Sequence, residues 1–542
     1  MVNGWTSSFF QPSRGVRQGC PLSPLLYVLC AEVLACRLRS APGIVGVQLP
    51  NSAQELRVSG YADDTTVVIS TDSSLAAVFE VYHEYELGSG AKLNRAKSKG
   101  IWLGAWKHRT DAPAGLDWVK HLPVLGAVLS ASDYTVETWE PRVVKVEKRL
   151  ASWKGRNLSY QGRALIINAL ALSQIWHLCA VFCMPGWVAS RLDKAIWPFF
   201  WAGKRDLVAR RTIFCPKFAG GFGLVDFRTK ASALRLQWFR RFLSDSSARW
   251  KDMFNFMFFR AFDKNILILL RQQSFSKARS KRLPLFYQNL LSAWRNFQGG
   301  NEAGHLVLGI RKDIPLAITT MTTQKTYRLG LSFHEKPPHC IEKFRPVYGD
   351  LYWSSTWQQL HAIHLSRPVI DLNWKIAHGV LYTASRLVNS FGYKKIDVVC
   401  FCRGDAETLE HLFFECSFAQ ILINWVFFQL LRVVPDATPF TVRELLFGFC
   451  GSRRRCIPPV IKWMLLVVKH QIWVARCDFR FREIPPDEAK CQKIAIARIQ
   501  FLLRVLASKF SSSSQKRALF EQKWLAGGIL GQFSDQKLVF PF

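Results

Sequence analysis

Two adjacent carboxylates stand in the sequence between two short strand-like runs. Asp63 and Asp64 fall within Val58-Ser-Gly-Tyr-Ala-Asp-Asp-Thr-Thr-Val-Val-Ile69, and the β-branched run from Thr65 to Ile69 is typical of a buried strand. Like charges at such a turn repel each other, and a divalent cation would relieve that repulsion. Phosphoryl transfer by two metals needs carboxylates that hold Mg²⁺ ions about 3.5–4 Å apart. The alternative is a solvated hairpin turn that binds no metal.

A second group of metal-ligating residues lies in the C-terminal half of the chain. Cys400, Cys402, His411 and Cys416 form the pattern C-x-C-x₈-H-x₄-C. Three thiolates and one imidazole suit tetrahedral Zn²⁺, and four protein ligands leave no open position for catalysis. We therefore expect a structural zinc site. The alternative is that these thiols and the imidazole are core side chains of a Phe-rich apolar segment.

The elements that must position these residues change in character along the chain. Residues 1–140 mix Gly/Pro turns with β-branched runs and a few helical stretches, one of them from about Leu25 to Leu38. Residues 141–240 switch to helical periodicity. The apolar run from Ala169 to Val188 is interrupted by polar residues and Pro185, so we expect a buried helix there and no membrane span.

The composition favours a folded protein with a polyanionic partner. The chain has 542 residues, enough for roughly three domains of ~150 residues, and its 73 Lys and Arg exceed its 39 Asp and Glu by 34. A 49% hydrophobic fraction excludes a disordered basic tail. The charge therefore points to nucleic acid or an anionic membrane, and the latter has little support because core-type Trp residues are interleaved with the basic ones. Fourteen Cys without a secretory signal favour a reducing compartment, nuclear or cytoplasmic.

A motif upstream of the carboxylates carries a family resemblance. The segment Arg17-Gln-Gly-Cys-Pro-Leu-Ser-Pro24 lies about 40 residues before Tyr61-Ala-Asp-Asp64, and both resemble motifs of the LINE-type (non-LTR) retrotransposon reverse transcriptases. The resemblance implies an RNA-directed DNA polymerase that uses Mg²⁺ and works on an RNA template and a DNA primer. It implies that Asp63 and Asp64 are the catalytic metal ligands. The residues that it implies for nucleotide and template binding are Arg17, Gln18, Gly19, Tyr61 and Lys97.

The resemblance continues beyond this region. Leu122-Pro-Val-Leu-Gly126 is similar to the strand pair that grips the primer end, and the basic stretch 142–217, with 14 basic residues against three acidic ones, resembles the thumb. We expect Ser159 to cap a helix there. The basic residues of this stretch that we expect to contact nucleic acid are Lys148, Arg149, Lys154, Arg156 and Arg163. The Cys/His cluster is similar to the zinc-binding module near the C-terminus of such polymerases, and Glu407 matches one of the intervening residues of that module.

One catalytic element of the family has no counterpart in this sequence. The family needs a third carboxylate from a strand before the Arg-Gln-Gly motif, yet only 14 residues precede Gly15 and none is acidic. We therefore expect a truncated polymerase that binds Mg²⁺ weakly and is catalytically incomplete on its own. The alternative is a non-catalytic RNA/DNA-binding relic of a retroelement.

The last hundred residues are basic and helical in pattern. Between Arg453 and Lys523 stand 16 basic and five acidic residues. In this stretch we expect Trp463, Leu466, Ile472 and Trp473 to form a buried stripe, and Arg476, Arg480 and Arg482 to form the exposed face of the same helix.

The predicted fold class is α+β, with a partial reverse-transcriptase palm followed by a mostly helical thumb and a helical C-terminal region that holds a small zinc knuckle. The predicted divisions are a partial palm without fingers and first palm strands (1–135), a helical thumb and connection (136–270), a linker or helical insertion (271–320), a linker and zinc-binding module (321–440), and a basic helical C-terminal region (441–542).

Overall fold

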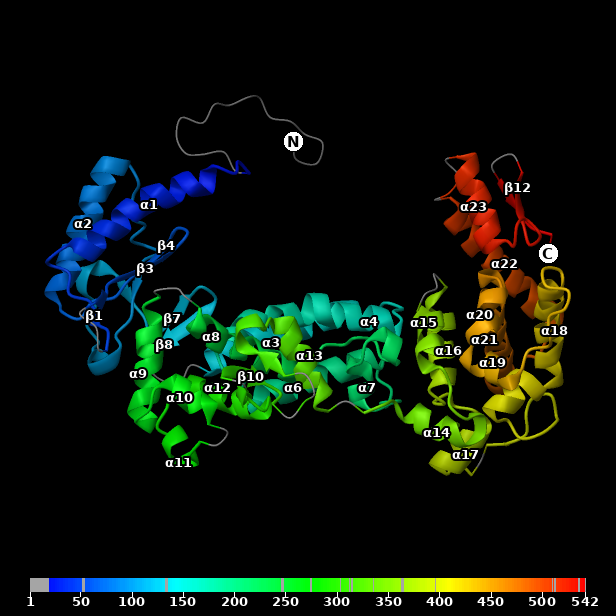
Figure 1. Ribbon diagram of the computed structural model, residues 1–542. Coiled ribbons are helices and arrows are strands. Elements are labelled where there is room, and N and C mark those ends of the chain that lie inside the picture. Colours follow the sequence, from blue (N-terminus) through cyan, green and yellow to red (C-terminus); the bar gives the residue numbers. More distant parts are fainter. Residues whose placement is uncertain are drawn as a thin grey trace, which may run out of the picture. The chain divides into compact units, whose positions relative to one another are not determined.

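The structure is a computed structural model, and its contacts divide the chain into two compact units (Figure 1). Unit 1 contains Met1–Pro141, Leu178–Pro185 and Ser232–Thr326, and unit 2 contains Arg142–His177, Gly186–Ala231 and Tyr327–Phe542. The five divisions expected from the sequence stay a prediction. The residues that the structure describes are 19–50, 54–131, 135–244, 248–272, 275–302, 304–310, 312, 315–334, 336–361, 365–394, 396–508, 510, 513–534 and 537–541.

The N-terminal part of unit 1 packs two helices against a hairpin. Its elements are α1 (Ser23–Ser40), β3 (Val58–Tyr61), β4 (Asp64–Val67) and α2 (Ser73–Ser89). Leu38 of α1 and Val78 and Val81 of α2 are buried in one cluster, against which Val58 and Val67 of the hairpin also pack. Burial of these apolar side chains is what fixes the hairpin relative to the helices.

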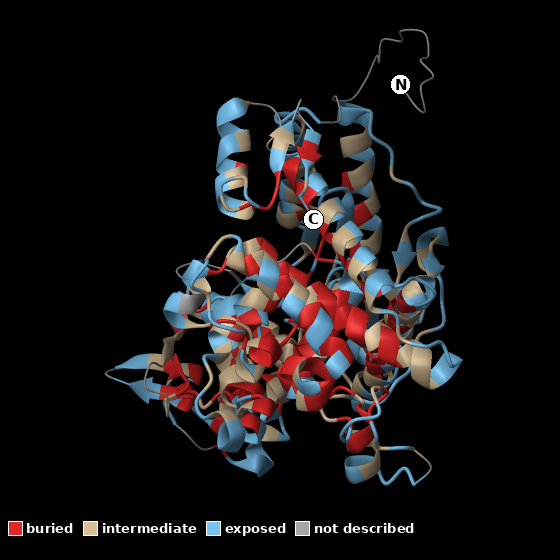
Figure 2. Ribbon diagram, turned by 90° about the vertical axis from the view of Figure 1, so that its right-hand side faces the viewer, coloured by how far each residue is buried: buried red, intermediate tan, exposed pale blue. Residues whose placement is uncertain are grey.

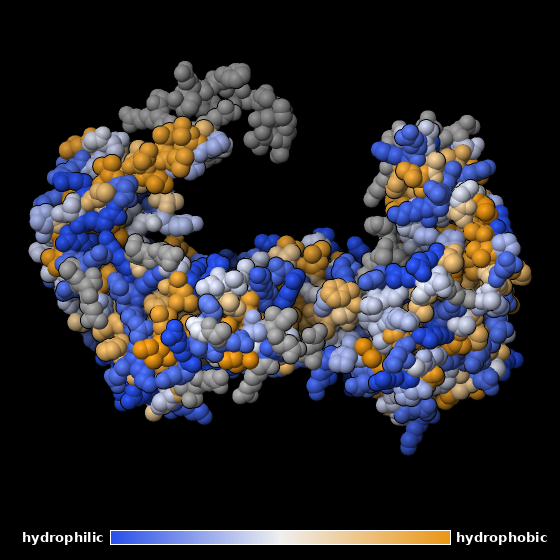
Figure 3. Space-filling model, viewed as in Figure 1, coloured by the Kyte–Doolittle hydropathy of each residue, from blue (hydrophilic) through white to orange (hydrophobic). Residues whose placement is uncertain are grey.

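The predicted helix over residues 25–38 is confirmed as α1, which extends two residues further at each end. Pro24 lies in its first turn, where a missing N–H costs nothing. At its C-terminal end, the Arg57 guanidinium donates to the carbonyls of Arg39 (2.7 Å) and Ala41 (3.0 Å). The outer face of α1 is apolar and exposed, as Figure 3 shows, with Leu25, Leu29 and Val33 more than half exposed.

The remaining elements of unit 1 are short strands and a helical layer. The strands pair as β1–β2, β3–β4 and β7–β8 (antiparallel), β5–β6 (parallel), and a three-stranded antiparallel sheet β11-β10-β9. The bounds of these strands and of the helices that accompany them are β1 (Val47–Gln48), β2 (Glu55–Leu56), β5 (Lys99–Gly100), η1 (Gly104–Trp106), η2 (Pro113–Gly115), β6 (Asp117–Trp118), β7 (His121–Val124), β8 (Ala127–Ser130), α9 (Trp250–Phe262), α10 (Ile266–Arg271), α11 (Lys277–Ser280), α12 (Leu285–Asn296), β9 (Gly300–Glu302), β10 (His305–Leu308), β11 (Leu316–Ala317) and η6 (Ile318–Thr320).

Unit 2 is almost entirely helical, and four helices (α3, α5, α8 and α13) have residues assigned to both units. The described part of the chain is thus a mixed helix-and-sheet structure, in agreement with the predicted α+β class. The bounds of these four helices and of the elements of unit 2 are α3 (Thr135–Lys154), α4 (Tyr160–Ile166), η3 (Ile167–Ala171), η4 (Leu172–Gln174), α5 (Trp176–Val181), α6 (Gly186–Phe200), α7 (Arg210–Phe214), η5 (Lys217–Ala219), α8 (Phe227–Leu243), α13 (Thr323–Ser332), α14 (His339–Tyr348), α15 (Trp353–His361), α16 (Arg367–Ala377), α17 (Ala384–Phe391), η7 (His411–Glu415), α18 (Ser417–Leu431), α19 (Val442–Phe447), α20 (Gly451–Cys456), α21 (Pro459–Arg482), α22 (Glu488–Ala507), α23 (Ser514–Trp524), β12 (Gln532–Ser534) and β13 (Lys537–Val539).

The prediction of one buried helix over Ala169–Val188 is wrong. The run is divided into a π-helical turn (η3), a 3₁₀ turn (η4) and two α-helices, α5 and α6. Pro185 immediately precedes α6 and has no N–H with which to continue α5. Among the described residues, none of the helices combines the length and apolar character that crossing a bilayer requires.

Helix α21 has thirteen buried residues among its 24, and Figure 2 shows the buried residues of the chain in red. Trp463 and Ile472 are buried as predicted, whereas Leu466 and Trp473 are half-buried. The same helix buries Lys469 completely, and the Lys469 Nζ donates to the Leu445 carbonyl of α19 at 2.5 Å. Burial lowers the pKa of Lys469 to about 7.

This buried amine predicts a pH dependence of stability. The folded chain loses the Lys469 proton near pH 7, whereas an unfolded chain holds it to about pH 10.4. Because the unfolded state binds more protons in this interval, the free energy of unfolding should rise with pH between about 7 and 10, by up to ~1.4 kcal/mol per pH unit. Urea unfolding of wild type and K469M across this range measures the effect, and K469M should lose this rise.

The matched control is K490M, which removes an exposed lysine of α22 in the same unit. Its unfolding free energy should follow the wild-type pH profile. A K469M profile parallel to that of the wild type would show that Lys469 titrates normally.

Candidate metal and nucleic-acid sites

The two adjacent carboxylates lie at the tip of a hairpin, as predicted. Strands β3 and β4 are antiparallel with Tyr61 opposite Asp64, so Ala62 and Asp63 form a two-residue turn. Ala62 has a φ of +50°, the left-handed conformation that such tight turns use. Asp63 and Asp64 are both exposed, and the neighbouring Tyr61 is 68% exposed. The hairpin therefore presents both carboxylates to solvent.

Helix α1 contacts this turn. The Tyr27 hydroxyl donates to the Ala62 carbonyl at 3.3 Å, and burial together with the negative charge of Asp63 raises the pKa of Tyr27. This contact joins α1, the helix that begins at the end of the first motif, to the turn that carries Asp63. Gly19 is exposed and has a φ of +87°, which favours glycine. Arg17 and Gln18 lie outside the described residues.

The other sequence-predicted residues of unit 1 lie on turns. Lys97 is exposed on a turn after α2, where its backbone N–H donates to the Asn94 side chain at 3.1 Å. The predicted strand pair around residues 122–126 is the hairpin of β7 and β8, and its turn residues Leu125 and Gly126 have φ values of +50° and +79°. Positive φ at both turn residues suits the right-handed twist of the strands.

Helix α3 separates an apolar face from a basic one. Val143, Val146 and Leu150 are buried, whereas Lys148 and Arg149 are exposed. This spacing is that of an amphipathic helix. Lys154, the last residue of α3, and Arg156 just beyond it extend the exposed basic surface, and the Arg156 guanidinium lies 4.2 Å from the centre of the Trp153 ring.

Arg163 differs from these residues because it is buried. Its guanidinium donates to the carbonyls of Phe199 (2.7 Å) and Leu158 (3.3 Å), and burial lowers its pKa. Ser159 caps α4 as predicted, since its hydroxyl accepts from the Gly162 N–H at 3.1 Å. The Asp371 carboxylate accepts from the Tyr160 N–H at 3.3 Å and holds the same helix end. Through these bonds Arg163 holds α4 against the C-terminal end of α6.

The four predicted zinc ligands converge. One ligand atom from each of Cys400, Cys402, His411 and Cys416 lies within 4.8 Å of the others, and three of the four residues are buried. The Cys400 and Cys416 sulfurs are 3.9 Å apart, and the Cys402 sulfur is 3.3 Å from the His411 Nε2. A tetrahedral Zn²⁺ with Zn–S bonds of about 2.3 Å would hold its sulfurs about 3.8 Å apart. The donor set and the spacing both fit this ion.

The backbone after residue 410 explains how His411 and Cys416 meet. In an α-helix, residues five apart point about 140° away from each other. Here His411–Glu415 form a π-helical turn, closed by a hydrogen bond from the Cys416 N–H to the His411 carbonyl at 2.8 Å. His411 Nδ1 lies 3.7 Å from the Glu415 carboxylate, which is too far for a hydrogen bond.

The other two ligands come from a tight knuckle. A bridge between Val399 and Ala406 closes it, and the Cys400 N–H donates to the Asp405 carbonyl at 3.0 Å. Gly404 approaches the ligands closely, because a Cβ there would lie 3.3 Å from the Cys402 sulfur and 3.4 Å from the His411 ring. A larger residue at position 404 would crowd the site.

The Cys416 thiol is made more acidic by its local surroundings. A hydrogen bond from the Cys400 thiol and the backbone N–H groups of Ala419 and Phe418 lower the pKa of Cys416 to about 6, against the opposing effect of burial. Cys416 is the N-cap of α18, where free N–H groups favour a thiolate. The pKa of Cys400 is raised by the same hydrogen bond and by burial.

Sequence reasoning missed the side chains behind the knuckle. Arg476 was expected on an exposed face, and that expectation is wrong, because Arg476 is buried and paired with the fully buried Glu407. Arg480 is mostly buried in the same group, and Arg482 is exposed as expected. The periodicity contained the signal, since Arg476 follows the buried Ile472 by four residues and so shares its face of α21.

Comparisons with known proteins agree with this arrangement. Residues 1–129 match the family described as "Reverse transcriptase (RNA-dependent DNA polymerase)". A transposon TX1 uncharacterized 149 kDa protein of Xenopus laevis is 33% identical over 296 residues, which are 52% of this chain and 22% of that protein. The retrovirus-related Pol polyprotein from the type-2 retrotransposable element R2DM of Drosophila melanogaster is 24% identical over 266 residues, 43% of this chain and 23% of that protein.

Residues 1–129 are therefore a reverse-transcriptase region, and the relatives named for transposons support the LINE-type resemblance. An uncharacterized mitochondrial protein of Arabidopsis thaliana is also similar, with 41% identity over 110 residues, 19% of this chain and 88% of that protein. The match covers less than a quarter of the length of each of the two transposon proteins.

Proposed function

We propose that this chain is part of the RNA-directed DNA polymerase of a LINE-type retrotransposon, and that Asp63 and Asp64 are its Mg²⁺ ligands. The hairpin that exposes both carboxylates, with Tyr27 of α1 bonded to its turn, is the observation that supports this best. Bound Mg²⁺ would stabilise the charge that develops on a transferred phosphoryl group. The protein's part is to hold two carboxylates at the tip of the hairpin, Asp63 in the turn and Asp64 at the start of β4.

The basic face of α3 supports binding of an RNA template and a DNA primer. Lys148, Arg149, Lys154 and Arg156 are exposed, so their charges can reach phosphates without desolvation in the protein core. Phosphate contacts of this kind depend on charge and not on base sequence. We leave Arg163 out of this surface because its guanidinium is bonded to backbone carbonyls.

This proposal predicts a change in salt dependence. K148A/R149A should bind an RNA–DNA duplex more weakly. The slope of log affinity against log salt is negative, and its magnitude should decrease by about 2, because each lost phosphate contact removes about one unit. Fluorescence anisotropy at several salt concentrations measures this. K277A/K281A removes two exposed lysines in and next to α11 of unit 1, and it should leave the slope near that of the wild type. Equal slopes for both variants would contradict a duplex surface on α3.

Catalysis by this chain alone is a separate question. Among the described residues, no third metal-ligating side chain joins Asp63 and Asp64, because groups of three or more such side chains occur there only at the cysteine cluster. Two-metal catalysis requires ligands around both ions. We therefore infer weak Mg²⁺ binding and poor positioning of the ions.

The corresponding experiment is primer extension on a primed RNA template with Mg²⁺. We expect wild type and D63N/D64N to give the same background, although both bind the duplex, since the substitutions affect only exposed turn residues. This outcome is expected of an incomplete part of a polymerase and equally of the second candidate, a non-catalytic RNA/DNA-binding relic. Extension by the wild type that D63N/D64N abolishes would instead establish a complete polymerase.

We also propose that Cys400, Cys402, His411 and Cys416 bind one structural Zn²⁺. The four ligand atoms surround a space of the right size, and all four positions would be occupied by protein. Because Cys400 and Cys402 come from the knuckle, His411 from η7 and Cys416 from the N-cap of α18, the ion would join the knuckle to the start of the helical segment that follows it.

Zinc content tests this site. Purified wild type should hold about one equivalent of Zn²⁺, C402S should hold much less, and chelation should lower the melting temperature of the wild type, since metal binding contributes folding free energy. C456S is the matched control, because Cys456 is a free, exposed cysteine outside the cluster. A wild-type protein without zinc uptake would remove the metal from this proposal.

A further inference from the structure

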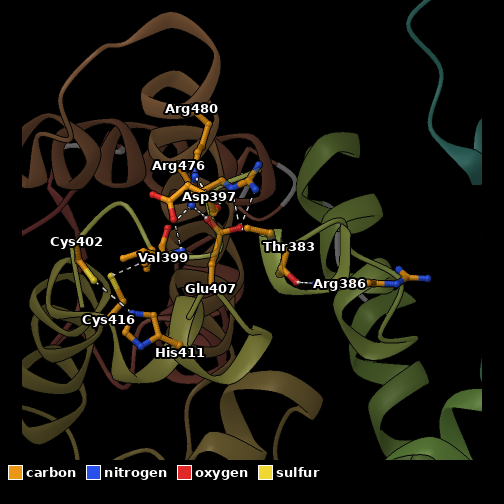
Figure 4. A network of polar contacts seen from close by, with 12 residues as sticks. Thr383, Arg386, Asp397, Val399, Cys402, Glu407, His411, Cys416, Arg476 and Arg480 are labelled. Carbon is orange, nitrogen blue, oxygen red and sulfur yellow. Dashed lines mark hydrogen bonds and ion pairs between the residues drawn. The ribbon is translucent and has the colours of Figure 1, made fainter. Parts of the chain in front are cut away.

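Behind the zinc cluster lies a buried carboxylate that the cluster itself does not use. Glu407 stands in the chain between Cys402 and His411, and its side chain points away from the sulfurs toward α21, as Figure 4 shows. Its exposed fraction is 0%. A carboxylate buried this completely must be compensated by hydrogen bonds or opposite charge, and the compensating groups show what the residue holds in place.

Two arginines of α21 supply most of that compensation. Arg476 donates to both carboxylate oxygens, with its Nη2 2.7 Å from Oε1 and its Nε 3.1 Å from Oε2. Arg480 adds a contact of 3.3 Å to Oε2. Arg480 also donates to the carbonyls of Asp397 and Val399, which lie just before the ligand Cys400. Both arginines therefore act on the segment that carries the first two zinc ligands.

Glu407 also connects this segment to α17. Its Oε1 accepts from the Ala384 N–H at 2.8 Å, at the N-terminal end of that helix. Its own N–H donates to the Val398 carbonyl at 2.8 Å, and its carbonyl accepts from the Ser385 N–H at 3.3 Å. The main chain and the side chain of Glu407 thus hold both strands of the knuckle against α17 and α21.

We propose that Glu407 is the positioning residue of the zinc site, and that through Arg476 it couples metal binding to the docking of α21. This inference rests on the proposed zinc function. The knuckle presents Cys400 and Cys402 on one side. On its other side, the Glu407–Arg476 pair fixes the distance between the knuckle and the rest of unit 2. By fixing the knuckle, the pair would keep the Cys400 and Cys402 sulfurs close to the His411 and Cys416 ligand atoms, as they are in this structure, so that little reorganisation opposes metal binding.

The pair is suited to this role because it is directional. Arg476 presents a planar fork to the carboxylate, so the pair defines an orientation as well as a distance. Removing the charge of Glu407 would leave a buried guanidinium without its partner, which is strongly unfavourable. The knuckle would then move to let Arg476 find water, and the four ligand atoms would no longer converge.

The test compares zinc affinity with stability in the full chain. In E407Q, the affinity for Zn²⁺, measured by competition with a chromophoric chelator, should fall about tenfold or more, the range seen when residues that orient metal ligands are changed. The measurement is made at a temperature where circular dichroism shows the metal-free variant to be folded. Under that condition a general loss of stability leaves the affinity unchanged, whereas a displaced knuckle lowers it.

Co²⁺ substitution gives a second readout. The absorption bands of tetrahedral Co²⁺ depend on ligand geometry, so in E407Q they should shift or weaken relative to wild type if the sulfurs are displaced. D371N is the matched control, because Asp371 is another mostly buried carboxylate of unit 2 that accepts from a backbone N–H, but it contacts no part of the knuckle in the described residues. Its zinc affinity and Co²⁺ spectrum should equal those of the wild type.

If E407Q does not fold, the R476K variant tests the same proposal. It preserves both charges but removes the planar fork, so affinity should again fall, by a smaller factor. Wild-type affinity in either folded variant, with an unchanged Co²⁺ spectrum, would overturn the positioning role. Absence of zinc from the wild type would instead refute the proposed zinc function, and the two failures are therefore distinguishable.

Discussion

A chain with 34 more basic than acidic residues must keep most of its positive charge in water, because an ion is costly to bury without a partner. This constraint shapes unit 2. Lys148 and Arg149 stay on the exposed face of α3, while Val146 and Leu150 turn inward. The buried cations are exceptions that each show their compensation: Arg476 meets a carboxylate, and Arg163 meets two carbonyls.

The same constraint applies to the acidic residues, which are the minority in this chain and are used in two opposite ways. The exposed pair Asp63 and Asp64 remains free for a cation because the hairpin holds it in solvent. Glu407 is used in the opposite way, since it is fully buried and neutralised by the arginines of α21. One arrangement suits a site that exchanges ligands, and the other suits a permanent joint.

Local signals were sufficient where a short segment decides its own structure. The hairpin around Asp63 and the cap at Ser159 were both predicted and both present, because turn geometry and capping depend on residues a few positions apart. The prediction failed over Ala169–Val188, where hydrophobicity alone suggested one helix. Burial in a large core can be achieved by several shorter helical pieces, so an apolar run does not determine helix length.

The sequence by itself determined the chemical types at both proposed metal sites and the spacing of the residues that we propose as ligands. Only the tertiary structure decided that Arg476 faces Glu407, because these residues are 69 positions apart and each alone reads as a solvated charge. The π-helical turn that brings His411 and Cys416 together was likewise decided only by the tertiary structure. Such features depend on the balance between desolvation and pairing, which exists only after distant segments have packed together.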